Sequence, residues 1–79
     1  MNFSDIHRRL ARYALRRIQC GAISERALAR RAGISQPHLH NILKGKRGFS
    51  FLSADMVMEA LDLTVEDLLR ETDNGGILR

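Results

Sequence analysis

The sequence predicts an all-α fold, and two observations support this. Its apolar residues recur at helical spacing, and no stretch alternates β-branched residues as a strand would. With one proline, no tryptophan and 44% hydrophobic residues, the predicted core is aliphatic. At 79 residues the chain is too short to build a second core, so we expect a single domain.

A first helix is predicted from residue 4 to residue 19. Ser4 is its expected N-cap, and Asp5 is well placed for the positive end of the helix dipole. One stripe of this helix is apolar and consists of Ile6, Leu10, Ala14 and Ile18. The stripe predicts a helix that is buried along one side. Cys20, which follows it, is expected to be a buried, unreactive thiol.

Two short helices joined by a tight turn are predicted between residues 24 and 45. Ser24 is the expected N-cap of the first, and Gly33 ends it because glycine adopts a positive φ without a Cβ penalty. Ser35 is the expected cap of the second, whose first turn tolerates Pro37. The predicted inner residues are Leu28, Ala29, Ala32, Leu39 and Ile42.

The C-terminal third predicts two more helices. Ser50 should cap the fourth, while Thr64 and Asp67 form the pattern of a capping box for the fifth. The predicted inward residues of the fourth helix are Phe51, Ala54, Val57, Met58 and Leu61. Leu52 and Met56 should lie on another, solvated side, and Phe49 should cover the core. We assign residues 1–71 to the domain and residues 72–79 to a flexible tail.

Charge is distributed unevenly along the chain, whose net charge is +4. Residues 1–50 hold eleven Lys and Arg against two acids, whereas residues 51–79 hold two Arg against seven acids. The basic half contains the two-helix segment. This pattern favours a protein that turns its basic half toward a polyanion and keeps its acidic half away from it.

The segment LAxxAGISxxxLxxILKGKR, from Leu28 to Arg47, resembles the helix-turn-helix of lambda-repressor-like (Cro/C1 or XRE-type) DNA-binding proteins. The likeness continues into the fourth and fifth helices and covers roughly residues 10–69. It implies a compact five-helix bundle that binds double-stranded DNA. The helix at about residues 35–43 is then the recognition helix, which enters the major groove.

The resemblance also implies roles for individual residues. Amide and imidazole side chains suit hydrogen bonding to base edges, and proline suits contact with a thymine methyl group. The residues expected to read bases are Gln36, Pro37, His38 and Asn41. The residues expected to contact phosphates are Arg26, Arg30, His40, Lys44, Lys46 and Arg47.

Three positions depart from the pattern of the family. Glu25 places an acid where a phosphate is expected, so either Arg26 compensates it or this end of the helix stands off from the backbone. Pro37 stands where a hydrogen-bonding base reader is usual. Leu43 replaces a glutamate that often pairs with an arginine, so we expect an apolar contact from Leu43 to Ile18 and an outward Arg17.

The favoured function is a small cytoplasmic transcriptional repressor that acts as a homodimer on an inverted repeat. Candidate dimer residues are Leu52, Met56, Leu69 and the tail. The alternative is an antitoxin or adaptor that keeps the fold but binds another protein, with the tail as the contact. We expect no enzyme, cofactor or metal: no catalytic constellation is evident, and His38 and His40, two apart on a helix, diverge by about 200°. No membrane segment or internal disulfide is predicted, because the chain has no long apolar run and a single cysteine.

Overall fold

The structure, a computed structural model, describes residues 2–73, with side chains as far as Arg70. The chain is all-helical over this range, which confirms the predicted fold class. Its helices are α1 (Phe3–Gln19), α2 (Glu25–Ala32), α3 (Gln36–Leu43), α4 (Phe51–Ala60) and α5 (Val65–Asp73). In the part of the chain that is described, no helix has the length and apolar character needed to span a bilayer.

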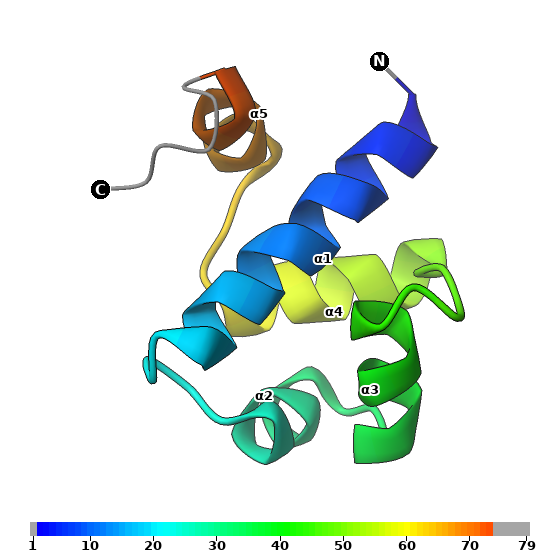
Figure 1. The fold of residues 1–79 in the computed structure, drawn as a ribbon. Coiled ribbons are helices and arrows are strands. Elements are labelled where there is room, and N and C mark those ends of the chain that lie inside the picture. The colour runs from blue at the N-terminus through cyan, green and yellow to red at the C-terminus, as the bar shows by residue number, and fades with distance from the viewer. Residues whose placement is uncertain (1, 74–79) are drawn as a thin grey trace.

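Helix α1 runs through the middle of the bundle and contacts α3, α4 and α5, while α2 packs against α3 and α4 (Figure 1). The core lies where these helices meet and is aliphatic apart from one phenylalanine. Its buried members are Leu10, Ala14, Leu28, Ala29, Ala32, Leu39, Ile42, Phe49, Ala54, Val57 and Leu68. Because α3 contributes two of them, the predicted recognition helix is anchored directly in the core.

The start of α1 differs from the prediction. Asn2, not Ser4, is the N-cap: its side chain accepts a hydrogen bond from the Asp5 amide at 3.0 Å. The Asp5 carboxylate in turn accepts from the Asn2 amide at 3.2 Å, which completes a capping box. Asparagine caps a helix as well as serine does, and here the reciprocal bond to Asp5 decides between them.

The two-helix segment forms as predicted. The Ser24 hydroxyl accepts from the Ala27 amide at 3.0 Å, and the Ser35 hydroxyl accepts from the His38 amide at 3.2 Å. Gly33 lies between the helices with φ +74°, a left-handed conformation in which an added Cβ would be strained. Two polar caps and one glycine therefore set where α2 begins and ends and where α3 begins.

Helix α4 presents a different face from the one predicted. Phe51, expected to be inward, is 63% exposed, and Met56, expected to be solvated, packs against the core. Leu52 is exposed as predicted. The predicted Ser50 cap is confirmed, and Ser50 forms a capping box with Ser53. In the first turn of α4, Ser53 is buried and Phe51 is exposed.

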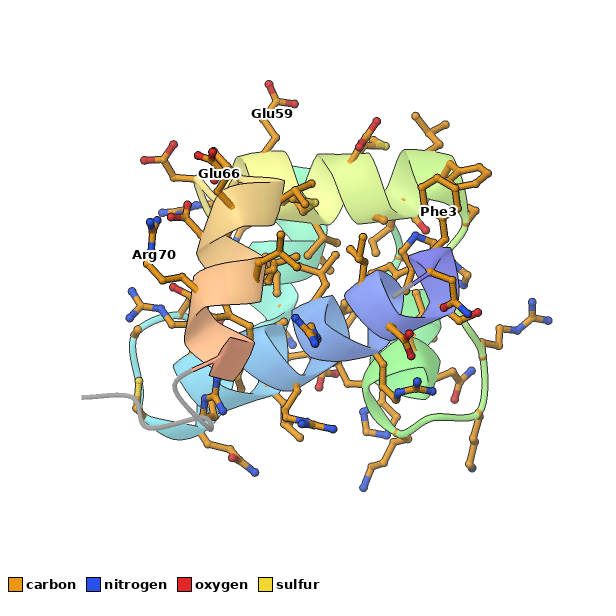
Figure 2. The ribbon with its side chains drawn as sticks, turned by 90° about the horizontal axis from the view of Figure 1, so that it is seen from above. Phe3, Glu59, Glu66 and Arg70 are labelled. Atoms are coloured by element: carbon orange, nitrogen blue, oxygen red, sulfur yellow. The ribbon has the colours of Figure 1, made fainter. Side chains whose placement is uncertain are left out.

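Aromatic rings gather where the starts of α1 and α4 meet. The Phe3 and Phe51 rings meet edge-on with centroids 4.8 Å apart, and Phe3 lies beside the first turn of α4 in Figure 2. The His7 ring lies 6.0 Å from the Phe49 ring. Phe49 is buried, which confirms the prediction that it covers the core. Phe3 therefore packs against the first residue of α4.

Cys20 is exposed, so the prediction of a buried thiol was wrong. It is the C-cap of α1, and its Sγ donates to the Arg17 carbonyl oxygen at 3.4 Å. The chain leaves the core at this point, so the side chain faces outward.

The predicted capping box of α5 is confirmed. The Asp67 carboxylate accepts from the Thr64 amide at 3.0 Å, and the Thr64 hydroxyl accepts from the Asp67 amide at 3.1 Å. Arg70 donates to the same carboxylate at 2.8 Å. Helix α5 includes positions 72 and 73 of the predicted tail, and residues 74–79 lie outside the described residues. The flexibility of the tail therefore stays a prediction.

We expect acid to destabilise the protein through Asp67. The backbone hydrogen bond at Thr64, followed by the bond from Arg70, holds the pKa of Asp67 below its ordinary value of 3.8. A carboxyl whose pKa is lower in the folded state stabilises that state above its unfolded pKa, and the contribution disappears as the pH falls through the folded pKa. The free energy of unfolding should therefore decline below about pH 4, as measured by urea denaturation at a series of pH values.

The variant Asp67→Asn keeps an acceptor for the cap but has no charge to titrate, so this decline should be shallower. Asp55→Asn, at an exposed position of α4, is the matched control and should keep the wild-type slope. Equal slopes for Asp67→Asn and the wild type would contradict the assignment.

Candidate nucleic-acid interface

Helix α3 and the loop after it form a surface of uncharged hydrogen-bonding groups followed by cations. Ser35 caps the helix, and Pro37 lies in its first turn, as the sequence predicted. Because Leu39 and Ile42 point into the core, the other side of the helix is left for a partner. This side of α3 is the candidate nucleic-acid interface.

The four predicted base-reading residues differ in exposure. Pro37 is exposed, while Gln36, His38 and Asn41 are half-buried. Half-buried side chains have fewer accessible rotamers, so less entropy is lost when they are fixed against a base.

The carboxylate of Glu25, the first residue of α2, contacts two side chains of α3. Gln36 donates from Nε2 to Glu25 Oε2 at 3.4 Å, and His40 Nδ1 lies 3.2 Å from the same oxygen. The prediction had offered compensation by Arg26 or a stand-off from the backbone. The structure instead shows His40 and Gln36 as the partners of this carboxylate. The sequence carried one signal for this, because Gln36 and His40 are four apart and therefore share one face of α3.

The loop after α3 is tied to the helix through its main chain. The amides of Lys46 and Arg47 both donate to the Asn41 carbonyl oxygen, at 2.9 and 3.3 Å. Gly45, with φ +81°, allows the chain to turn back in this way. The backbone that carries the two cations is therefore held at a defined place relative to the end of α3.

The predicted phosphate-contacting residues all lie at the surface. They are Arg26, Arg30, His40, Lys44, Lys46 and Arg47, each of them exposed. They come from α2, from α3 and from the loop that follows α3. Exposed cations on adjacent elements are the usual means of holding a duplex by its phosphates.

Acidic side chains gather away from this surface. Glu59 near the end of α4 and Glu66 at the start of α5 project from the α4–α5 edge of the bundle (Figure 2). Charge is therefore distributed unevenly over the surface of the fold as well as along the sequence. Such a dipole orients the molecule as it approaches a polyanion.

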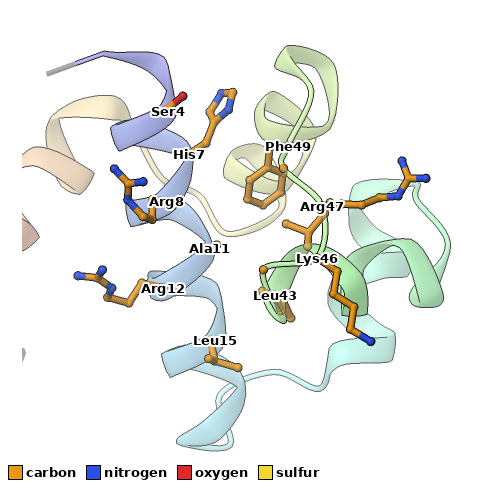
Figure 3. A pocket seen from close by; sticks show the side chains of 13 residues that line it. Ser4, His7, Arg8, Ala11, Arg12, Leu15, Leu43, Lys46, Arg47 and Phe49 are labelled. Carbon is orange, nitrogen blue, oxygen red and sulfur yellow. The ribbon is translucent and has the colours of Figure 1, made fainter.

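Leu43 is half-buried and packs against the core, as expected for a leucine that replaces one member of an ion pair. It lines a pocket with Ala11 and Leu15 of α1 (Figure 3). Arg17 is exposed, also as expected. The predicted contact between Leu43 and Ile18 stays a prediction, although both residues pack against the core.

Metal-binding chemistry finds little support at this surface. Among the residues that the structure describes, His, Cys, Asp and Glu form no group of three or more that could hold an ion. His40 is instead occupied by Glu25.

Comparison with protein families agrees with this surface. A family model described as a Cro/C1-type HTH DNA-binding domain matches residues 20–73, which include α2 to α5. The chain therefore belongs to the Cro/C1-type helix-turn-helix DNA-binding family, and DNA is its partner. Searches of curated proteins and of solved structures found no match.

Proposed function

We propose that this DNA-binding protein is a transcriptional repressor that binds an inverted repeat as a homodimer in the cytoplasm. The observation that carries the proposal is the surface of α3, where four uncharged or polar residues precede a loop with three cations. A recognition helix inserted in the major groove presents such residues to base edges, while the cations contact the flanking phosphates.

Base reading is assigned to Gln36, Pro37, His38 and Asn41. The amide of Gln36 has two N–H groups, and one of them donates to Glu25. The remaining N–H and the carbonyl oxygen form the pair that matches N7 and N6 of adenine. Glu25 thereby fixes which way the amide points.

Phosphate contact is assigned to Arg26, Arg30, His40, Lys44, Lys46 and Arg47. Glu25 alone would repel a phosphate. Its contacts with His40 and Gln36 support a carboxylate that is occupied within the protein at this end of α2. His40 then has two roles, one toward Glu25 and one toward the DNA backbone.

Dimerisation is proposed because a single domain of this size covers few base pairs, and two-fold dimers place their recognition helices about 34 Å apart. Of the candidate dimer residues, Leu52 is exposed, whereas Met56 and Leu69 are half-buried. Leu52 is therefore the best supported of the three.

Binding to duplex DNA tests the proposal. The protein should be titrated onto a duplex from the region upstream of its own gene at two salt concentrations. Binding should weaken at higher salt, with a log–log slope of about −0.9 for each phosphate that is neutralised. Selection from a random pool should return two half-sites one helical turn apart.

Three results would count against parts of this proposal. Single half-sites in the selected pool would contradict the homodimer. Activation of a reporter gene by the bound protein would contradict repression. Binding to no duplex at any salt concentration would favour the antitoxin or adaptor role.

A further inference from the structure

A pocket with a volume of about 590 Å³ lies between α1 and the loop that joins α3 to α4 (Figure 3). Small-molecule sites in proteins have volumes of roughly 300–1,000 Å³. The proposed contacts of α3 with DNA do not account for this pocket, because its walls include α1.

The inner wall of the pocket is apolar. Ala11 and Leu15 contribute to it from α1, Leu43 from α3, and Phe49 from the loop. Phe49 is buried and Leu43 half-buried, so these side chains are fixed in the fold before any ligand arrives. A ligand for this wall needs an aliphatic or aromatic body.

The rim of the pocket is cationic. Arg12 of α1 and Lys46 of the loop stand on opposite sides of it in Figure 3, where both side chains are exposed and extend outward from the pocket. Arg47 also lines the pocket, and no acidic residue is among its lining residues. Arg8 lines it too, but its guanidinium already pairs with Asp5. A ligand for this rim needs a negative charge.

We propose that this pocket binds a free carboxylate with an aliphatic chain, and that the bound ligand weakens DNA binding. The chain lies on the wall formed by Ala11, Leu15, Leu43 and Phe49, and the carboxylate lies at the rim, where the exposed side chains of Arg12, Lys46 and Arg47 turn toward it. An open site with an apolar wall and a cationic rim favours a small amphipathic anion over a nucleotide, because the base and sugar of a nucleotide require fixed polar partners.

The effect on DNA follows from residues that both ligands use, and it rests on the proposed function. Lys46 and Arg47 are assigned to phosphates, and a carboxylate at the rim neutralises the same cations. The DNA complex then loses phosphate contacts while the ligand is bound. Such a protein would release its operator when the carboxylate accumulates.

Decanoate, below its micelle concentration, is the probe for the site. Titrated into the full-length protein and followed by amide NMR shifts, it should give saturable shifts at Ala11, Leu15 and Phe49. Decanol, which has the same chain without the charge, should bind at least about tenfold more weakly if the cations contribute near 1.4 kcal/mol.

Two variants locate the site. Ala11→Met fills the pocket and should weaken decanoate binding at least about tenfold. Arg12→Ala should weaken it by about two- to fivefold, the range of an exposed ion pair. Arg31→Ala removes an exposed arginine of α2 that does not line the pocket, so it should leave decanoate affinity unchanged. A thermal melt of each variant checks that it is folded.

Several results would overturn the site. They are the absence of saturable shifts, shifts confined to the exposed Phe3, Phe51 and Leu52, and binding only to vesicles of anionic phospholipid. A full response to decanoate in Ala11→Met would also overturn it.

Competition is tested separately with a duplex that the protein binds. Decanoate at saturation should lower the affinity for this duplex by about tenfold or more, as expected when two phosphate contacts are lost. Unchanged DNA affinity in the presence of bound decanoate would overturn the competition. If the protein binds no duplex at all, the proposed function fails, and the decanoate shifts still decide whether the pocket is a ligand site.

Discussion

Leu39→Ala is expected to lower the free energy of unfolding by about 2–5 kcal/mol. Leu39 is fully buried and joins α3, the proposed recognition helix, to the core. Truncation removes apolar contacts and leaves a cavity that neighbouring helices fill only in part. A domain of this size has a free energy of unfolding of about 5–15 kcal/mol at most. The variant should therefore be largely unfolded at urea concentrations well below the midpoint of the wild type.

The matched control is Leu52→Ala, the same change at a residue that is 69% exposed on α4. Its free energy of unfolding should stay within about 0.5 kcal/mol of the wild type. Urea denaturation followed by circular dichroism measures both variants. Equal losses for Leu39→Ala and Leu52→Ala would show that burial in this structure does not describe the folded protein in solution.

Gln36→Ala is expected to remove the preference for one base pair of the operator. The discrimination lost should be about 1–3 kcal/mol, the value of one good bidentate contact to a base. The measurement is competition between the best duplex and duplexes changed at single positions. At one position the wild-type protein should distinguish the four bases, and the variant should bind all four alike.

Lys46→Ala is the control that separates base reading from phosphate contact. It should weaken binding to all duplexes alike and reduce the salt slope by about 0.9. Gln36→Ala should leave that slope unchanged. If Gln36→Ala instead weakened every duplex equally, Gln36 would not read a base.

Much of the fold was predictable because its signals are local. Ser24, Gly33 and Ser35 act within one helical turn of their own positions, and the structure confirms all three. At the start of α1 the same kind of signal led to Ser4, whereas Asn2 is the cap. Only the reciprocal bond with Asp5 separated them.

Helix α4 shows where local reasoning fails. Apolar residues occur on all sides of this helix, so its periodicity does not define which side is buried. Its inner side follows from packing against α2, and this contact turned Met56 inward and Phe51 outward. The exposure of Phe51 was therefore not readable from its own segment.

The candidate site was predictable in outline. The resemblance placed the recognition helix, and residue chemistry suggested which side chains suit bases or phosphates. The sequence also marked Glu25 as anomalous. What it did not show is that Gln36 and His40 approach that carboxylate, because the contact joins two different helices.

The bonds from the amides of Lys46 and Arg47 to the Asn41 carbonyl have a consequence for how this protein can evolve. They join main-chain atoms only, so substitutions at positions 46 and 47 other than proline leave the course of the loop unchanged as long as Gly45 can turn. Charge at these positions can therefore be gained or lost in small steps while the recognition helix keeps its place. If Lys46 and Arg47 contact phosphates as proposed, affinity for DNA and choice of sequence are in this way open to selection one at a time.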